Sequence, residues 1–322
     1  MKTVIAYSKL SEYISERPPL LMVDRLEIGA DGRSARGVKA VSIGEMYFIG
    51  HFGPGAEIMP GVLQVAAMAQ VGEALLRRPG SGREGRVARV RAISRVKFRK
   101  PVLPGALLTV EAEHKGTTAD GLEQITAKTL VGDAVACQGN IDLEFVDRND
   151  PMATASELAP PIRMPTDIGS DHGMDVEAVM RKIPHRFPFL LVDKVLALDV
   201  QVDTQSGRAV TLKSVTGNEP FFAGTAVPVM PLYLLAEASA QAACVIALTL
   251  PENESKLGYF MSIDHARSLT PIVPGDQLVI DATLTGRGGR FGIAEAKLMV
   301  GDRLVAETSL KFVIVGHNEK VE

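Results

Sequence analysis

The pattern of apolar and polar positions predicts two long buried helices and a set of half-buried strands. Residues 62–76 and 232–250 are apolar nearly all round, which is typical of core helices. In the C-terminal half, residues 277–285, 291–300 and 303–313 alternate apolar and polar side chains, as strands with one buried face do. The pattern therefore predicts an α+β fold in which an antiparallel sheet wraps around a central helix.

The same order of elements occurs twice along the chain. Strand patterns at 107–114, 123–131 and 134–145 repeat the three strands of the C-terminal half. Four motifs also recur in the same order: Pro18–Arg25 with Pro188–Lys194, Gly44–Gly50 with Asn218–Gly224, Met59–Pro60 with Met230–Pro231, and Pro101–Gly105 with Pro271–Gly275. A chain of 322 residues has room for two domains of ~150 residues each.

The repeat predicts two units joined by a linker. We expect a first unit at 1–148, a linker at 149–173 and a second unit at 174–322. The linker is rich in proline, serine, threonine and aspartate and has no apolar periodicity. Its length allows the two units to lie side by side.

The two copies differ at two positions that can carry proton-transfer chemistry. Aligned on their Met-Pro dipeptides, the first copy has His51 where the second has Thr225. The second copy has Glu237 where the first has Ala66. A neutral imidazole, with a pKa near ~6.5, can accept a proton at neutral pH. Glu237 lies in an apolar helix, where desolvation is expected to raise its pKa and favour the protonated, donating form.

Several motifs resemble a known enzyme family. Pro184–Asp193, Asn218–Phe222 and the Met-Pro…Gln241 run are similar to the FabZ type of (3R)-hydroxyacyl-acyl carrier protein dehydratase. Gly50–Phe52 and Met59–Leu63 resemble the same family and its FabA relatives. The resemblance covers nearly all of both units and implies the hot-dog fold. In that family two subunits pair through their sheets, and each site takes a histidine from one subunit and a helix-borne carboxylate from the other.

Applied to this chain, the resemblance implies a tandem double hot-dog, an internal pseudo-dimer with one complete site. His51 of the first unit and Glu237 of the second would remove the α-proton and protonate the departing β-hydroxyl of a (3R)-3-hydroxyacyl thioester, leaving the trans-2-enoyl product. The opposite site would hold Thr225 and Ala66, which cannot do this chemistry. By resemblance, the backbone N–H of Leu232 at a helix N-terminus stabilises the thioester oxyanion.

Two departures from the family pattern lie near this predicted site. Leu232 replaces the glycine of the family, and its side chain could narrow the pocket. The loop from His51 to Met59 is longer than its counterpart in the second unit and contains Gly53-Pro54-Gly55. Glu57 in this loop is expected to be solvated.

Three further polar residues have structural interpretations. Gln70 and Gln241 occur at equivalent positions, which favours structural hydrogen bonds over catalysis. His185 lies in a Pro-His-Arg turn, where we expect a structural role. The other histidines show no metal-ligand spacing, so neither a metal nor a cofactor is expected.

A run of basic residues marks a candidate partner surface. Residues 77–100 carry ten basic side chains against Glu84 alone, whereas the counterpart at 251–270 carries a mixture of charges. An acidic carrier protein with a phosphate-bearing arm could dock on such a strip. A solvated surface is the alternative. The residues predicted to contact the carrier or its phosphopantetheine arm are Arg95, Lys97, Arg99 and Lys100.

Composition limits the remaining classes. The formal net charge is -3 and 46% of residues are hydrophobic, which favours neither a nucleic-acid binder nor a membrane-surface protein. The basic strip contains a single aromatic residue, Phe98, which argues against single-stranded nucleic acid. No apolar stretch reaches the ~18–20 residues of a membrane span. The only cysteines, Cys137 and Cys244, are expected to be reduced thiols of a cytoplasmic protein.

Two functions remain open at this stage. The first is a dehydratase of fatty-acid or polyketide synthesis whose substrate is bound to acyl carrier protein or coenzyme A. The second is a degenerate hot-dog module that binds acyl chains or a partner without turnover. A thioesterase would need an acid aimed at the carbonyl, and the motifs disfavour it. Acyl chain length, isomerase activity and assembly beyond the pseudo-dimer are left undetermined.

Overall fold

The computed structural model describes most of the chain. The described ranges are 3–53, 55–147, 160–169, 173–225, 228–254, 256–286 and 290–316. Most of the expected linker at 149–173 lies outside the described residues, as does Pro54 of the expected Gly53–Gly55 loop. The boundaries expected for the two units therefore stay predictions.

The first unit contains one long helix among strands. Its elements are β1 (Thr3–Ile5), a 3-10 helix (Tyr7–Glu12), β2 (Arg25–Ile28), β3 (Ser34–Ala40), α1 (Tyr47–Gly50), α2 (Gly61–Leu76), β4 (Arg86–Phe98), β5 (Leu107–Thr117), β6 (Glu123–Val131) and β7 (Ala134–Asp147). The second unit repeats this order. Its elements are α3 (Val176–Lys182), β8 (Lys194–Gln201), β9 (Ser206–Ser214), a 3-10 helix (Pro220–Phe222), α4 (Leu232–Thr249), a 3-10 helix (Pro251–Asn253), β10 (Lys256–Ser268), β11 (Gln277–Gly286), β12 (Phe291–Val300) and β13 (Arg303–Gly316).

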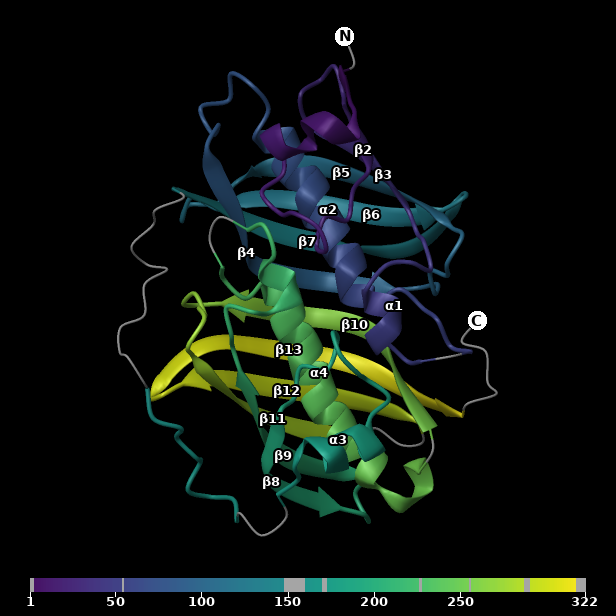
Figure 1. Cartoon of the computed structure of the whole chain (residues 1–322), viewed down its shortest axis with the longest axis vertical. Helices are drawn as coiled ribbons and strands as arrows, with labels where there is room; N and C mark the ends of the chain where they lie inside the picture. Colours follow the sequence, from purple (N-terminus) through teal and green to yellow (C-terminus); the bar gives the residue numbers. More distant parts are fainter. Residues whose placement is uncertain are drawn as a thin grey trace.

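All named strands join into a single antiparallel sheet. The strand order is β1-β2-β3-β5-β6-β7-β4-β10-β13-β12-β11-β9-β8, so the two halves mirror each other about the β4–β10 pair. At this seam Ser262 lies opposite Lys97 and Ala266 lies opposite Ile93. Both long helices pack on the same face of the sheet (Figure 1). The expected double hot-dog architecture is confirmed.

The two long helices form the core because they are apolar on every side. The helix α2 is buried from Val62 to Leu76, and α4 is buried from Leu232 to Leu248. The glutamine in each helix is held by backbone groups, as expected: Gln70 bonds to the Leu20–Met22 segment. Gln241 bonds in the same way to Phe189 and Leu191. These bonds fix an extended segment of each unit along its own helix.

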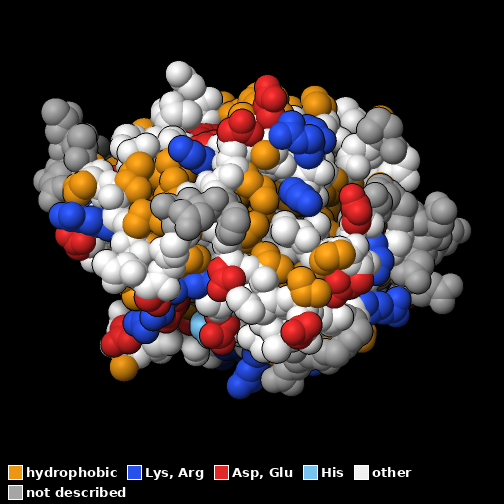
Figure 2. Space-filling view, turned by 90° about the horizontal axis from the view of Figure 1, so that it is seen from below, with side chains coloured by type: hydrophobic (Ala, Val, Ile, Leu, Met, Phe, Trp, Pro, Cys, Tyr) orange, Lys and Arg blue, Asp and Glu red, His pale blue; other side chains and the backbone are white. Residues whose placement is uncertain are grey.

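Contrary to the expectation that no apolar stretch is long enough, helix α4 (Leu232–Thr249) is long and apolar enough to cross a membrane, but 89% of that stretch is buried inside the protein. This burial identifies it as a core helix. On the face of the molecule in Figure 2, acidic and basic side chains are interspersed with apolar ones. This face therefore offers no surface of a single charge sign.

Candidate active site

His51 lies directly after α1 and is held in one orientation. Its backbone N–H donates to the carbonyl of Tyr47 at 3.0 Å. Its ring Nδ1 lies 2.8 Å from the carbonyl oxygen of Ile58. Because a carbonyl can only accept, Nδ1 carries the proton and Nε2 keeps a free lone pair. The ring is therefore oriented and tautomerically set as a proton acceptor.

The segment that carries His51 lies against the second unit. The backbone N–H of Arg186 donates to the carbonyl of Gly50 at 2.8 Å. A Cβ added to Gly50 would collide with the carbonyl oxygen of Arg186, so no larger residue fits there. This close backbone approach places His51 of the first unit beside the helix of the second.

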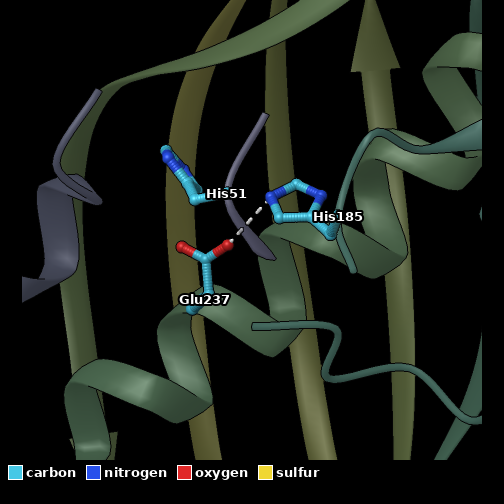
Figure 3. A group of neighbouring side chains, drawn as sticks. All are labelled: His51, His185 and Glu237. Carbon is cyan, nitrogen blue, oxygen red and sulfur yellow. Dashed lines mark ion pairs between the residues drawn. The ribbon is translucent and has the colours of Figure 1, made fainter. Parts of the chain in front are cut away.

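Glu237 projects from α4 toward His51 (Figure 3). The residue is only 2% exposed. Its Oε1 accepts a hydrogen bond from Gln241 Nε2 at 2.9 Å and lies 3.3 Å from Nε2 of His185. Facing donor and acceptor atoms of His51, His185 and Glu237 all lie within 4.8 Å of one another. The structure therefore brings together the two residues that the sequence pairs, across the two units.

His185 is the member of this group that sequence reasoning missed. It is buried, and its ring lies edge-on to His51 with 5.5 Å between the ring centres. A signal was present in the sequence, because Gln241 follows Glu237 by one helical turn and so shares its face. Gln241 bonds to the backbone of Phe189 and Leu191 and so holds the segment after His185 against α4. This packing brings His185 beside Glu237.

The group lies in a cavity of about 500 Å³ built from both units. Apolar side chains form much of its wall, and the rings of Phe98 and Phe260 lie 5.7 Å apart at the seam. Gly61, the first residue of α2, also lines this cavity. A cavity with an apolar wall and a few convergent polar groups is the usual form of a small-molecule site.

A family model described as the FabA-like domain matches residues 14–140 and again residues 183–309. The chain belongs to the FabA-like family. The two matches correspond to the two repeated units and together cover most of the chain.

Individual relatives agree with this assignment. A FabA-like relative named 3-hydroxyacyl-[acyl-carrier-protein] dehydratase FabZ, from Streptococcus pneumoniae (strain Hungary19A-6), is 43% identical over 143 residues, 44% of this chain and 98% of the relative. The protein of the same name from Pelotomaculum thermopropionicum is 42% identical over 143 residues, again 44% of this chain, and 99% of its own length. One FabZ chain thus corresponds in length to about one unit here.

Solved structures share the fold of the whole chain. The dehydratase domain from the CurJ module of curacin polyketide synthase has a TM-score of 0.59 at 11% identity, covering 92% of this chain and 96% of that one. The dehydratase domain of PpsC from Mycobacterium tuberculosis, solved with C12:1-CoA, has a TM-score of 0.58 at 13% identity, covering 92% and 99%. These structures show that both FabA-like units are arranged as in known two-unit dehydratase domains.

The expected oxyanion donor, Leu232, does not lie in the cavity of this FabA-like site. Leu232 lines a second cavity, whereas the cavity with His51 and Glu237 contains Gly61 instead. The reason is helical geometry: five residues separate Leu232 from Glu237, a rotation of about 140° that turns them to different sides of α4. The expectation that Leu232 lies beside His51 and Glu237 is therefore wrong. The orphan N–H at a helix start that can face the site is that of Gly61.

The protonation of the FabA-like pair also differs from the expectation. Burial, with a smaller contribution from the His185 charge, lowers the pKa of His51 to about 4. Burial alone would raise the pKa of Glu237. The hydrogen bond and charge of His185, together with the charge of His51, outweigh burial, so the pKa of Glu237 lies below its ordinary value. At neutral pH His51 is neutral, as expected, while Glu237 is ionised in the free protein, which corrects the expectation of a protonated acid.

The four expected docking residues divide into separate groups. Arg99 and Lys100 line the active-site cavity. Arg95 lines a different surface hollow, and Lys97 is exposed and lines none of the three cavities described. The rest of the basic strip is partly neutralised by acids on neighbouring strands, as in the pairs Arg83–Glu123, Arg86–Asp147 and Arg91–Glu144.

The three facing side chains have the composition of a three-ligand zinc site with an open position. Their contacts with one another and with Ile58 serve acid–base chemistry equally well, so the expectation that the site needs no metal stays a prediction. Glu57 of the neighbouring loop does not line the cavity, and its carboxylate accepts from the backbone N–H of Gly55 at 3.0 Å.

Proposed function

We propose that the chain dehydrates (3R)-3-hydroxyacyl thioesters to trans-2-enoyl thioesters at a single site between its two units. The observation that carries the proposal is the meeting of His51 and Glu237 from different units in one cavity. Membership of the FabA-like family and the names of the relatives support the reaction class. Among the described residues that line the other cavity no such pair occurs, and Thr225 stands in place of the histidine.

His51 acts as the general base. Its neutral form presents the Nε2 lone pair, because Nδ1 donates to Ile58. A low pKa keeps this form populated through the whole neutral range. The developing enolate oxygen then needs a hydrogen-bond donor, and the Gly61 N–H at the start of α2 supplies it. A Cβ at Gly61 would lie 2.9 Å from the ring of Phe98, so glycine keeps this approach open.

Glu237 and His185 together deliver the second proton. Nε2 of His185 lies 3.3 Å from the Glu237 carboxylate, so a proton can pass between them. A bound acyl chain excludes water from the cavity, which raises the pKa of the buried carboxyl toward the protonated form. Glu237 then protonates the departing β-hydroxyl, which leaves as water. His51 retains the α-proton and returns it to the Glu237–His185 pair after product release, so the proton balance closes.

The substrate arm is the feature shared by acyl carrier protein and coenzyme A. Arg99, Lys100 and Arg290 line the cavity that holds the catalytic pair, and their charges suit the phosphate of a phosphopantetheine arm. The apolar wall suits the acyl chain. We favour acyl carrier protein as the partner, in fatty-acid or polyketide-like synthesis in the cytoplasm. Assembly beyond the internal pseudo-dimer stays undetermined.

Turnover of (3R)-3-hydroxyoctanoyl-N-acetylcysteamine tests the proposal. We expect His51→Ala and Glu237→Gln each to lower kcat by about 10²–10⁴-fold, the usual contribution of a positioned acid or base. His265→Ala and Glu254→Gln change the same residue types at exposed positions and should leave kcat unchanged. An inert wild type would favour the degenerate binding module, and full activity in both site variants would exclude the composite site.

A further inference from the structure

A second cavity lies at the position that the internal symmetry assigns to the missing site. It has a volume of about 160 Å³ and is lined by the start of α4, by β4 and by the segment around Glu16. Glu16 and His185 both stand three residues before the matched prolines Pro19 and Pro188. The substitutions relative to the active site are Thr225 for His51, Glu16 for His185, Ala66 for Glu237, Leu232 for Gly61, Tyr233 for Val62 and Glu73 for Cys244.

These substitutions did not fill the region with apolar side chains. Glu73 is buried and accepts hydrogen bonds from the backbone N–H of Ser15 at 3.0 Å and from Arg77 at 3.1 Å. The carboxyl groups of Glu16 and Glu73 are in hydrogen-bond contact, and burial together with the Glu73 charge raises the pKa of Glu16 to about 8. The two carboxyls therefore share one proton at neutral pH, and Arg77 balances the remaining negative charge.

Tyr233 brings an unused hydroxyl group to this region. Its side chain lines the second cavity and is only 1% exposed. Its hydroxyl has no hydrogen-bond partner among the described residues. An unpaired buried hydroxyl costs ~1–3 kcal/mol, and the valine at the equivalent position of the first unit avoids that cost. A bound acceptor would remove the penalty.

We propose that the second cavity binds a small uncharged acyl group, whose carbonyl oxygen accepts a hydrogen bond from the Tyr233 hydroxyl, and that it does not turn this ligand over. The carboxyl pair and Arg77 form a neutral cluster. The arginines that line the cavity have partners of their own: Arg91 is paired with Glu144, Arg17 donates to the backbone carbonyls of residues 14–16, and Arg89 is likewise engaged. The neutral Tyr233 hydroxyl is therefore the donor that the cavity offers, which suits an uncharged ligand. Phe221, Phe222 and Met230 supply the apolar wall for a short chain. A cavity of this size holds a molecule with about six heavy atoms, because ~150 Å³ accommodates benzene. The site shares no lining residue with the proposed active-site cavity.

Methyl NMR of protein labelled at the methionine methyl groups tests the proposal, with crotonamide as the probe. Met230 lines only the second cavity and Met59 only the active-site cavity, so each methyl reports on one site. We expect crotonamide to shift the Met230 methyl resonance saturably at millimolar concentration. Tyr233→Phe should weaken this binding at least about fivefold, the effect of one lost hydrogen bond.

A blocking variant and its control locate the ligand. Ala88→Leu fills the second cavity and should abolish the Met230 response, while Ala92→Leu makes the same change on β4 away from all the described cavities. Butyrate, the anionic analogue, should leave Met230 unshifted. An unresponsive Met230 methyl, equal affinity in wild type and Tyr233→Phe, or equal binding of butyrate would each overturn the proposal. The Met59 methyl reports separately on the active-site cavity, so failure of one site is distinguishable from failure of the other.

Discussion

The two cavities of the chain are built from equivalent elements with the roles of the two units exchanged, yet their polar side chains differ. One joins His51, His185 and Glu237 in about 500 Å³, and the other is reduced to about 160 Å³ around Tyr233 and the Glu16–Glu73 pair. The fold of both units is retained in full. The comparison teaches that, after duplication, only one of the two cavities needed to keep a histidine paired with an acid. The sheet and the helices serve both cavities, and they kept their packing.

The largest expected effect comes from comparing substitutions at the first residues of the two long helices, α2 and α4. Gly61→Ala places a Cβ 2.9 Å from the Phe98 ring and displaces the N–H that faces the enolate oxygen. We expect kcat/KM for the hydroxyoctanoyl thioester to fall about 100-fold, as for loss of one oxyanion donor. Leu232→Ala, at the equivalent position of α4, should change kcat/KM less than about twofold. The reverse result would assign the donor to α4, as the sequence resemblance implies.

The second effect concerns stability and the Glu16 carboxyl. Its pKa is about 8 in the folded protein and near ~4.3 in an unfolded chain, so its ionisation destabilises the fold as pH rises between these values. Glu16→Gln removes this titration and keeps a donor for Glu73. We expect the variant to gain about 2 kcal/mol relative to wild type between pH 5 and pH 9, a value reduced by proton sharing with Glu73.

Urea unfolding at pH 5, 7 and 9 measures this difference. Glu254→Gln, an exposed glutamate of the other unit, is the control and should show no pH-dependent change relative to wild type. A constant difference between Glu16→Gln and wild type across this range would show that the carboxyl titrates normally.

The third effect concerns the arm of the substrate. Arg99→Glu with Lys100→Glu reverses two charges that line the active-site cavity. We expect KM for a carrier-protein substrate to rise about tenfold and kcat to stay constant, since rim charges act mainly on encounter. Arg95→Glu with Lys97→Glu makes the same charge change on β4 away from this cavity and should have little effect. Similar losses in both pairs would favour a diffuse basic surface instead of an arm site.

Local pattern was enough to predict the helices and strands. The apolar run at 62–76 became α2 (Gly61–Leu76), and the alternating run at 291–300 became β12 with the same bounds. The cross-unit pairing of His51 with Glu237 also came from the sequence, because complementary losses in a repeat imply a shared site. These features depend on short-range periodicity and on repeat alignment, which a sequence displays directly.

The missed features depend on how elements cross. The rotation along α4 separates Leu232 from Glu237, and only the three-dimensional packing shows which helix start faces which cavity. The acids that neutralise Arg83 and Arg91 come from other strands of the sheet, so the basic run overstated the free charge. The direction of the Glu237 pKa shift likewise depends on His185, a neighbour 52 positions away along the chain.

The smallest expected effect tests His185 as the proton partner of Glu237. Its charge helps to lower the pKa values of both His51 and Glu237, so removing it should raise both. Since His51 works as the neutral base, activity is lost as pH falls through its pKa, which is about 4 in wild type. In His185→Gln we expect the acid limb of the kcat/KM profile to move up by about one pH unit and kcat at pH 7 to fall about fivefold. Circular dichroism at each pH restricts the comparison to folded protein. A lower kcat with an unmoved acid limb would mean that His185 only supports the backbone. A shifted limb would show that His185 sets the protonation of His51 and Glu237, the pair whose counterparts Thr225 and Ala66 cannot titrate in this way.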